Sequence, residues 1–464
     1  MKNIDQLFSD QKKFYLNHLI NEKLVNQITR LKLIKKWIKE NEQEIINHIL
    51  KDYKKPITEI YTTELKPTIS HIDYTIKNIK KWKKPKSVKT PIHLIGTKSK
   101  IYYEPKGLCL IISPWNYPLN LTLNPLISAV AAGNCCMVKP SEYTPNTTLI
   151  ISKMITDIFK KEHVSIIPGD HTIGNKLINL PFNHIFFTGS PEIGQKVMSA
   201  ASKNLASVTL ELGGKNHTIV DDSANIKDCA EKIIWTKALN CGQTCIACNH
   251  IFVHKKIANE FYKQLDKAIL KLFPIGLKNN ADYGQIVNKK HLKRINKLLN
   301  TFLKKESNLK SDNINEEQFI GITILKNIEL DNEILKQEIF GPLLPVVEYD
   351  DLNKIVQYIQ KNEKPLALYI FSNNKKNIDL ILNKTSSGTS AVNDCLIQYM
   401  NPNLPFGGVN TSGMGKTGGK RTFLNFTNEK SVLIQQSGSS IAKLFYPPYT
   451  NIKEKLAKKL TWWI

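Results

Sequence analysis

Residues 108–139, LCLIISPWNYPLNLTLNPLISAVAAGNCCMVK, contain the repeating unit that decides the fold. Residues 108–112 form a short continuous apolar run, which is typical of a strand buried on both faces. Residues 121–132 are alanine-rich and helical in character, and residues 135–138 are again strand-like. Two buried strands joined by a helix predict a parallel βαβ unit.

The same alternation continues as far as residue 212. Strand-like runs occupy residues 164–167, 184–187 and 208–211, and helical stretches occupy residues 147–159 and 191–201. Five short apolar strands alternating with helices predict a parallel, doubly wound α/β sheet, and a dinucleotide would bind in the crevice at its strand ends. A second alternating region from residue 213 to about residue 392 predicts a second α/β domain.

The segments outside the alternating regions complete the expected organisation. Residues 24–38 carry apolar side chains at a three-four spacing, which predicts a helix packed on a core. Residues 83–101 are rich in proline, lysine and threonine and predict an extended arm. We therefore expect a first α/β domain that could bind a dinucleotide (1–82 and 102–212), a second α/β domain (213–422), an arm (83–101 and 423–450) and a basic tail (451–464).

The composition limits the classes of protein. The 464 residues carry a formal charge of +25, but the lysines are spread along the chain without a zinc-finger, basic-zipper or RNP-like motif, so we expect no specific nucleic-acid partner. No run of 18 apolar residues and no N-terminal signal peptide is found, so we expect no transmembrane anchor and a cytoplasmic protein. The basic, aromatic tail leaves weak contact with a membrane surface open.

Two segments carry the chemistry. Asn240-Cys241-Gly242-Gln243-Thr244-Cys245 places a cysteine after a small, polar turn, which makes Cys245 a candidate nucleophile. Leu210-Glu211-Leu212-Gly213-Gly214-Lys215 places a carboxylate at a strand end beside two glycines, so Glu211 is a candidate general base if burial raises its pKa. Each segment alone is a weak signal, because buried cysteines are usually structural.

A metal site is the alternative interpretation of the cysteine cluster. Cys241, Cys245, Cys248 and His250 have the spacing C-x3-C-x2-C-x-H. Structural zinc sites usually pair two short knuckles across a longer loop, and four ligands within ten residues would be cramped. We therefore expect no metal, and we consider Cys248 a small buried residue or a thiol that could form an inactivating disulfide with Cys245.

Together these segments resemble the aldehyde dehydrogenase superfamily, and most closely its class-three, fatty-aldehyde branch. The resemblance covers about residues 24–449 and rests on motifs in a fixed order: Pro114-Trp115-Asn116-Tyr117-Pro118, Lys139-Pro140-Ser141-Glu142, Phe187-Thr188-Gly189-Ser190, Glu211-Leu212-Gly213-Gly214-Lys215, Gly242-Gln243-Thr244-Cys245, Glu338-Ile339-Phe340-Gly341-Pro342, Lys364-Pro365-Leu366-Ala367-Leu368-Tyr369 and Pro405-Phe406-Gly407-Gly408. It implies a Rossmann-type NAD-binding domain, an α/β catalytic domain and a small oligomerisation arm that joins a homodimer.

The resemblance also implies the catalytic roles. Cys245 would attack the aldehyde carbon and give a thiohemiacetal, whose oxygen would be held by the Asn116 side chain and the Cys245 backbone N–H. Hydride transfer to the nicotinamide would leave a thioester, and Glu211 would activate the water that hydrolyses it. The expected product is a carboxylic acid, from medium- or long-chain aliphatic aldehydes or from aromatic aldehydes.

The expected cofactor site departs from the usual G-x-G-x-x-G fingerprint. Gly189 and Gly194 bracket a helix start instead, with Ser190 as N-cap, and that helix could receive a pyrophosphate. By resemblance, Lys139 and Glu142 approach the adenosine ribose, Glu338 holds the nicotinamide ribose and Phe340 lies near the nicotinamide ring. A carboxylate at Glu142 disfavours a 2′-phosphate, so NAD is the first choice, with NADP open. The full expected set is Lys139, Glu142, Thr188, Gly189, Ser190, Ile193, Leu212, Gly213, Glu338 and Phe340.

Two departures from the branch affect the substrate prediction. Ala247-Cys248-Asn249 stands where the branch usually has a proline and an acidic residue, and Gln398 stands where a histidine is common. Substrate class therefore rests on analogy, and a semialdehyde dehydrogenase or an acyl-CoA-forming dehydrogenase remains an alternative. A catalytically silent binding or structural protein is a further alternative, against which the presence of Cys245, Glu211 and Asn116 argues.

Overall fold

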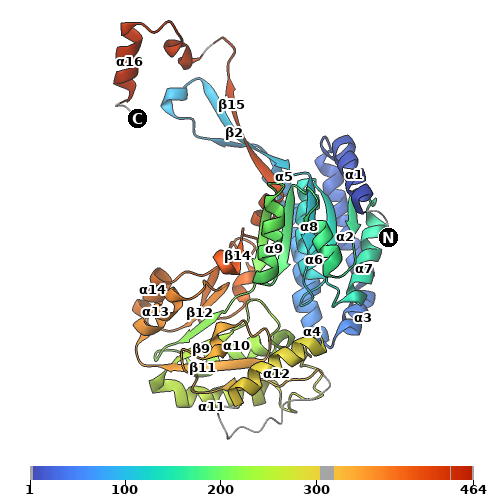
Figure 1. The fold of residues 1–464 in the computed structure, drawn as a ribbon, viewed down its shortest axis with the longest axis vertical. Coiled ribbons are helices and arrows are strands. Elements are labelled where there is room, and N and C mark those ends of the chain that lie inside the picture. The colour runs from blue at the N-terminus through green and yellow to red at the C-terminus, as the bar shows by residue number, and fades with distance from the viewer. Residues whose placement is uncertain (1–3, 304–317, 439, 462–464) are drawn as a thin grey trace.

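The computed structural model describes residues 4–303, 318–438 and 440–461, and its first sheet has the order β14-β7-β6-β3-β4-β5 (Figure 1). The strands are β3 (Leu108–Ile112), β4 (Cys135–Lys139), β5 (Val164–Ile166), β6 (His184–Gly189), β7 (Ser207–Leu212) and β14 (Gly413–Met414). Strands β3 to β7 are parallel, which confirms the predicted doubly wound sheet. The strand order reverses between β3 and β6, where such sheets form a ligand-binding crevice. The edge strand β14 is antiparallel to β7 and was not expected from the sequence.

Helices cover both faces of this sheet. Successive residues of a strand point to opposite sides, and apolar residues point to both sides, so both faces must be covered. Cys109 and Ile111 pack into one core, and Leu108 and Leu110 pack into the other. The first face carries α2 (Leu24–Glu40), α3 (Glu42–Asp52), α5 (Lys66–Lys83), α6 (Asn120–Ala132), α7 (Pro145–Ile158) and α15 (Lys420–Asn425). The second face carries α1 (Ile4–Phe14), α8 (His171–Ile178) and α9 (Pro191–Ser202).

The second sheet is parallel throughout and has the order β10-β11-β9-β8-β12-β13. Its strands are β8 (His217–Val220), β9 (His250–His254), β10 (Thr323–Leu325), β11 (Leu343–Tyr349), β12 (Ala367–Phe371) and β13 (Thr389–Val392). The helices that pack around it are α10 (Ile226–Ala238), α11 (Lys255–Leu272), α12 (Lys289–Leu303), α13 (Leu352–Lys361) and α14 (Lys375–Lys384). Only residues 213–216 separate β7 of the first sheet from β8 of the second.

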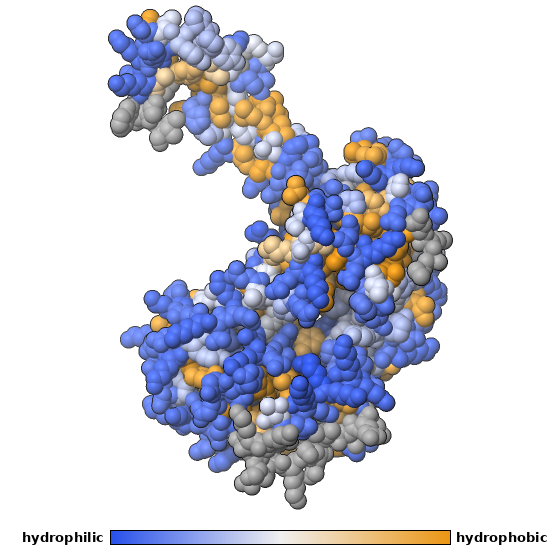
Figure 2. Space-filling model, viewed as in Figure 1, coloured by the Kyte–Doolittle hydropathy of each residue, from blue (hydrophilic) through white to orange (hydrophobic). Residues whose placement is uncertain are grey.

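The third sheet forms an arm that extends away from the body (Figure 1). It joins β1 (Lys86–Val88), β2 (Thr97–Pro105) and β15 (Thr427–Gln435) in antiparallel pairs, with η3 (Ile92–Leu94) between the first two strands. The far end carries η8 (Ile441–Phe445) and α16 (Asn451–Thr461), so part of the basic tail is helical. Apolar side chains are exposed along the arm, as Figure 2 shows, and include those of Ile95 and Leu433.

Several shorter elements connect these layers. They are η1 (Tyr15–Leu19), α4 (Ile57–Ile60), η2 (Tyr61–Leu65), η4 (Leu239–Gly242), η5 (Glu333–Lys336), η6 (Ile397–Met400) and η7 (Asn410–Ser412). Trp462 and Trp463, which the sequence places in the aromatic tail, lie outside the described residues. Among the helices of the described part, none combines the length and the apolar character that crossing a bilayer requires.

Phe423 of α15 tests how the C-terminal segment is fastened to the first sheet. Its side chain is fully buried, and its ring centroid lies 5.5 Å from that of Trp82. We expect Phe423→Ala to lower the free energy of unfolding by about 3–5 kcal/mol, because it removes a buried aromatic ring and leaves a cavity. Urea denaturation measures the loss, with Leu149→Ala at an exposed position of α7 as the control. Equal losses in both variants would contradict the packing described here.

Candidate active site

The turn before Cys245 is built from three consecutive residues in the left-handed region. The φ values of Asn240, Cys241 and Gly242 are 51°, 56° and 71°. A Cβ atom on Gly242 would lie 2.4 Å from the Gly341 carbonyl oxygen, so the position requires glycine for space as well as conformation. The Gln243 amide fastens the turn, since its Nε2 donates to the carbonyl oxygens of Asn240 and Gln285, each at 2.9 Å. The reversal carries the chain from α10 back to the end of the sheets.

Cys245 is partly exposed and lies in an electrically unfavourable place for a thiolate. Burial and, after it, the carboxylates of Glu338 and Glu211 raise the pKa of its thiol to about 12, while the backbone N–H groups of Cys245 and Ile246 oppose the rise. Asn216 holds the backbone here, because its Nδ2 donates to the Cys245 carbonyl oxygen at 2.7 Å. The cysteine therefore rests as a thiol, and to act as the predicted nucleophile it would first need a proton acceptor.

Glu211, at the end of β7, has the properties of such an acceptor. Burial raises its pKa to about 8, and the Thr417 hydroxyl and the Lys416 ammonium oppose that rise. Thr417 Oγ1 donates to Glu211 Oε1 at 2.9 Å, and the other oxygen, Oε2, is buried without a hydrogen-bond partner among the described residues. A carboxylate that titrates near neutral pH and keeps one oxygen unused is suited to take a proton from a thiol or from water.

Asn116 follows β3 and is buried. Its Nδ2 donates to the Gln243 carbonyl oxygen at 3.1 Å, so the side chain points to the turn that carries Cys245. An amide nitrogen has two N–H donors, and the second remains for an oxygen bound beside Cys245.

Glu338 and Phe340 lie between η5 and β11 and are fixed through their backbone. Arg294 donates to the carbonyl oxygens of Glu338 at 3.3 Å and Ile339 at 2.6 Å. Burial raises the pKa of Glu338 to about 7, opposed by a hydrogen bond from the Gly214 backbone N–H and by the charges of Arg294 and Lys237. Phe340 has a φ of 45°, and its ring meets that of Trp115 edge-on at 5.4 Å.

The expected adenosine and pyrophosphate residues form a second group. Lys139, at the end of β4, donates to Glu142 at 2.9 Å. Thr188 and Gly189 end β6 opposite Glu211 and Leu212 of β7. Ser190 caps α9 by accepting the Ile193 backbone N–H, and the Ile193 side chain is exposed.

These residues fit a dinucleotide. A Cβ atom on Gly194 would lie 2.7 Å from Leu212 Cδ2, so the glycine lets α9 pack closely on β7 with its N-terminus at the end of the sheet. That N-terminus suits a pyrophosphate, with Lys139 and Glu142 on one side of it. Gly213 lies on the other side, where its Cβ atom would meet a carboxylate oxygen of Glu338 at 2.0 Å.

The cysteine cluster divides among separate partners. Cys241 Sγ contacts the Tyr283 hydroxyl at 3.3 Å, Cys248 Sγ lies 3.6 Å from Cys395 Sγ, and His250 bonds to His217 at 2.7 Å. Within the part of the chain that the structure describes, no group of three His, Cys, Asp or Glu side chains is placed to hold a metal ion.

Four residues that contact the predicted site residues were missed by sequence reasoning. Thr417 and Lys416 face Glu211, and Arg294 and Lys237 hold the 338–341 turn, where Lys237 Nζ donates to the Gly341 carbonyl oxygen at 2.9 Å. All four lie far along the chain from the groups they contact. The one signal in the sequence is Lys237, a lysine inside an otherwise apolar helical face.

Comparison with known proteins agrees with this geometry. The model of the aldehyde dehydrogenase family matches residues 23–432. The chain is 40% identical over 453 residues to a Staphylococcus aureus 4,4'-diaponeurosporen-aldehyde dehydrogenase, covering 97% of each chain. It is 34% identical over 428 residues to the Pongo abelii aldehyde dehydrogenase family 3 member A2, covering 92% of this chain and 88% of the relative. A substrate-bound structure of Staphylococcus aureus AldH superposes with a TM-score of 0.94 at 39% identity, covering 99% and 100% of the two chains.

The chain therefore belongs to the aldehyde dehydrogenase family and is an NAD(P)-dependent aldehyde dehydrogenase. The relatives include family 3 members, which confirms the branch that the motifs indicate.

The raised pKa of Glu211 predicts a pH-dependent effect of Glu211→Gln on stability. Between its ordinary value of 4.5 and about 8, the folded protein holds a proton that the unfolded chain has lost, so this residue lowers the free energy of unfolding as pH rises through that range. We expect Glu211→Gln to be more stable than the native protein at pH 8 by a few kcal/mol, at about 1.4 kcal/mol per pKa unit, and to differ little at pH 4.5.

Calorimetry at the two pH values measures the difference. Glu192→Gln, at an exposed position of α9, is the control. A difference between the Glu211 variant and the native protein that stays constant with pH would refute the raised pKa.

Proposed function

We propose that this enzyme oxidises medium- or long-chain aliphatic aldehydes, and aromatic aldehydes as a second class, to carboxylic acids through a thioester on Cys245. The observation that carries the proposal is the convergence of Cys245 with the carboxylates of Glu211 and Glu338, beside the Asn116 amide. A nucleophile, a base with a raised pKa and fixed amide donors are the parts that acyl chemistry on a thiol requires.

The first half of the reaction forms the thiohemiacetal. Glu211 accepts the thiol proton, and Cys245 Sγ then forms a bond to the aldehyde carbon. The charge that develops on the aldehyde oxygen is stabilised by the free Asn116 N–H and by the backbone N–H of Cys245. When bound, NAD(P) supplies a positively charged ring that accepts the hydride. Gly213, Gly214 and Glu338 line the end of the cofactor site where the hydride-accepting ring would bind.

The second half hydrolyses the thioester. Glu211 first releases the thiol proton to solvent. It then takes a proton from a water molecule, and the resulting hydroxide adds to the thioester carbon. The bond from carbon to Sγ breaks, the acid leaves, and Glu211 returns the proton to Sγ. The Thr417 hydroxyl keeps one carboxylate oxygen occupied, so the unpartnered oxygen Oε2 is the one that faces the water. Asn116 and the Cys245 N–H stabilise the second oxyanion as they do the first.

Aromatic side chains support an apolar substrate. Tyr117 and Tyr399 are both close enough to Cys245 for their pKa values to respond to its charge. Near them, Met400 and Ile397 of η6 are exposed. Relatives named for 4,4'-diaponeurosporen-aldehyde and for coniferyl aldehyde agree with an aldehyde of substantial apolar surface.

We further propose that the domains follow the sequence-based division, with residues 1–82 and 102–212 binding the cofactor, residues 213–422 carrying Cys245, and residues 83–101 and 423–450 forming a dimerisation arm. The exposed apolar side chains of the arm, among them Ile95 and Leu433, support a homodimer. Sedimentation equilibrium tests it, and a monomer at micromolar concentration would contradict it.

The thioester mechanism predicts two distinct kinetic defects. Cys245→Ala should abolish cofactor reduction at 340 nm across an aldehyde chain-length series, since no covalent intermediate forms. Glu211→Gln should keep only a slow turnover without a burst of reduced cofactor, because the thiol must then lose its proton to solvent, and should lack the rise in rate through about pH 8 that we expect of the native enzyme. Free acid without a coenzyme A requirement should be the product.

Each alternative has its own signature. Turnover of semialdehydes alone would contradict the aliphatic assignment, and a strict coenzyme A requirement would indicate an acyl-CoA-forming enzyme. Binding of cofactor without any turnover would indicate a silent protein.

Glu142 predicts a preference for NAD. Its carboxylate is partly exposed beside Lys139, where the resemblance expects the adenosine ribose, and it would repel a 2′-phosphate. We expect Glu142→Gln to raise kcat/KM for NADP about tenfold and to change that for NAD by less than about twofold. Steady-state kinetics with both cofactors measure the ratio, and Glu40→Gln, at an exposed carboxylate paired with Lys36 at the end of α2, is the matched control. An unchanged ratio would show that this carboxylate does not select the cofactor.

A further inference from the structure

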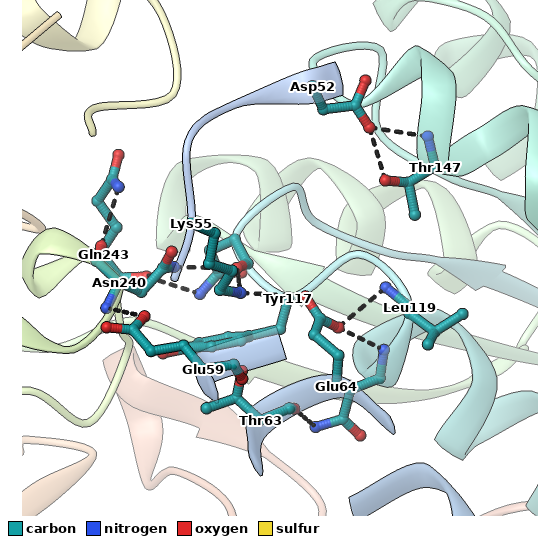
Figure 3. Close-up of polar contacts among 12 residues, drawn as sticks. Asp52, Lys55, Glu59, Thr63, Glu64, Tyr117, Leu119, Thr147, Asn240 and Gln243 are labelled. Atoms are coloured by element: carbon teal, nitrogen blue, oxygen red, sulfur yellow. Dashed lines mark hydrogen bonds and ion pairs between the residues drawn. The ribbon is translucent and has the colours of Figure 1, made fainter. Parts of the chain in front are cut away.

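One segment outside both proposed sets of site residues contacts the two turns that form the oxyanion site. Residues 52–64, which we call the brace, run from the end of α3 through α4 and η2 (Figure 3). Its side chains point toward the turn after β3 on one side and toward the turn before Cys245 on the other, as the close-up shows.

The brace contains a fully buried ion pair. Lys55 Nζ lies 3.1 Å from Glu64 Oε1, and neither side chain is exposed to solvent. The second oxygen of Glu64 accepts the backbone N–H groups of Leu119 at 3.1 Å and Asn120 at 2.9 Å, where α6 begins. Burial raises the pKa of Glu64, and Lys55 and these two amides oppose the rise. Every charge in the pair therefore has a fixed partner.

The carbonyl oxygen of Asn116 is the point where the brace meets the first turn. It accepts hydrogen bonds from Lys55 Nζ at 3.2 Å, from the Tyr53 hydroxyl at 2.8 Å and from Asn240 Nδ2 at 2.9 Å. Three donors on one carbonyl fix its position and direction, and thereby the backbone from which the Asn116 side chain projects.

Glu59 makes the corresponding contact with the second turn. Its Oε2 accepts the backbone N–H of Asn240 at 2.8 Å, and Asn240 is the first of the three left-handed residues before Cys245. The Asn240 side chain also bonds to the Gln243 carbonyl oxygen at 3.1 Å, which is the same oxygen that the Asn116 amide contacts. The brace thus reaches both turns within one hydrogen-bonded network.

We propose that Lys55, Glu59 and Glu64 are positioning residues that set the separation between the Asn116 amide and the Cys245 backbone N–H, the two oxyanion donors. The inference rests on the proposed roles of Asn116 and Cys245. Asn116 belongs to the first sheet and Cys245 to the segment leading into the second, so a brace between them controls geometry that neither sheet fixes alone. A misplacement of about 1 Å at a reacting centre lowers rates about 100-fold.

Stability alone does not account for the arrangement. Replacing a buried ion pair by neutral side chains of similar volume is often neutral or stabilising, so the pair is a poor device for holding a fold together. Asp52 in the same segment shows what a purely structural role looks like. Its carboxylate accepts the backbone N–H groups of Asn146 and Thr147, each at 2.8 Å, at the start of α7. Asp52→Asn is therefore a matched control within the brace.

The test uses the full chain and a reaction that needs no cofactor, the hydrolysis of p-nitrophenyl acetate through Cys245. The double variant Lys55→Met/Glu64→Gln removes both charges of the pair together, so that neither of these two residues is left as an unpaired buried ion. We expect its kcat to fall about 10- to 100-fold, with KM and the dissociation constant for NAD within about twofold of the native values. Asp52→Asn should lower Tm and leave kcat within about twofold.

Glu59 provides a second arm that leaves the ion pair intact. Glu59→Ala removes the acceptor for the Asn240 N–H and should lower kcat about tenfold, whereas Glu59→Gln keeps an oxygen acceptor and should recover most of the rate. A merely structural residue would lower Tm in both variants without this rescue.

The possible outcomes distinguish a failure of the proposed function from a failure of the positioning role of the brace. Hydrolysis that persists in Cys245→Ala would overturn the proposed function, and the inference with it. Hydrolysis that requires Cys245 but proceeds at the native kcat in the double variant and in Glu59→Ala would overturn the inference alone. An equal loss of kcat in Asp52→Asn would also overturn it, because the effect would then follow from loosening the segment.

Discussion

The close approach of backbone to side chain at residues 213–214 is the constraint on which the rest of the site depends. A Cβ atom on Gly213 would lie 2.0 Å from Glu338, and one on Gly214 would lie 2.8 Å from the backbone nitrogen of Leu366. These two glycines lead directly from β7 of the first sheet toward β8 of the second. Because they carry no side chain, the end of one sheet can meet the loops of the other, and Glu211 and Glu338 come within electrostatic reach of Cys245.

Where the two sheets meet, several polar side chains around Cys245 form their hydrogen bonds to backbone atoms. Asn216, the last residue before β8, donates to the carbonyl oxygens of Cys245 and Ala247 and accepts the Ala367 backbone N–H. Arg294 and Lys237 likewise donate hydrogen bonds to carbonyl oxygens of the 338–341 turn. Turns with left-handed residues store strain, and buried hydrogen bonds to their carbonyl oxygens hold them in place.

Much of this could be predicted from the sequence, because the signals are local. The five parallel strands follow from short apolar runs separated by helical stretches, and the match of several ordered motifs gave the family. The partners of those motifs could not be predicted in the same way. Thr417 lies 206 residues from Glu211, and neither its residue type nor the residues beside it in the sequence indicate the contact. The brace was missed for the same reason. In the sequence, Lys55 and Glu64 have the pattern of exposed charges on a helical segment, and only the structure shows that both side chains are buried.

Burial of charge at the site opposes stability and serves catalysis by one mechanism. Burial raises the pKa of Glu59 to about 7, of Glu211 to about 8 and of Glu338 to about 7. Each rise means that the carboxylate is less stable in the folded protein than in water, so each disfavours folding above its ordinary pKa. In the mechanism proposed above, the same desolvation makes Glu211 basic enough to take a proton near neutral pH and keeps Cys245 a thiol until the base acts. A better-solvated site would be more stable, but its carboxylate would be too weak a base for either half of the proposed reaction.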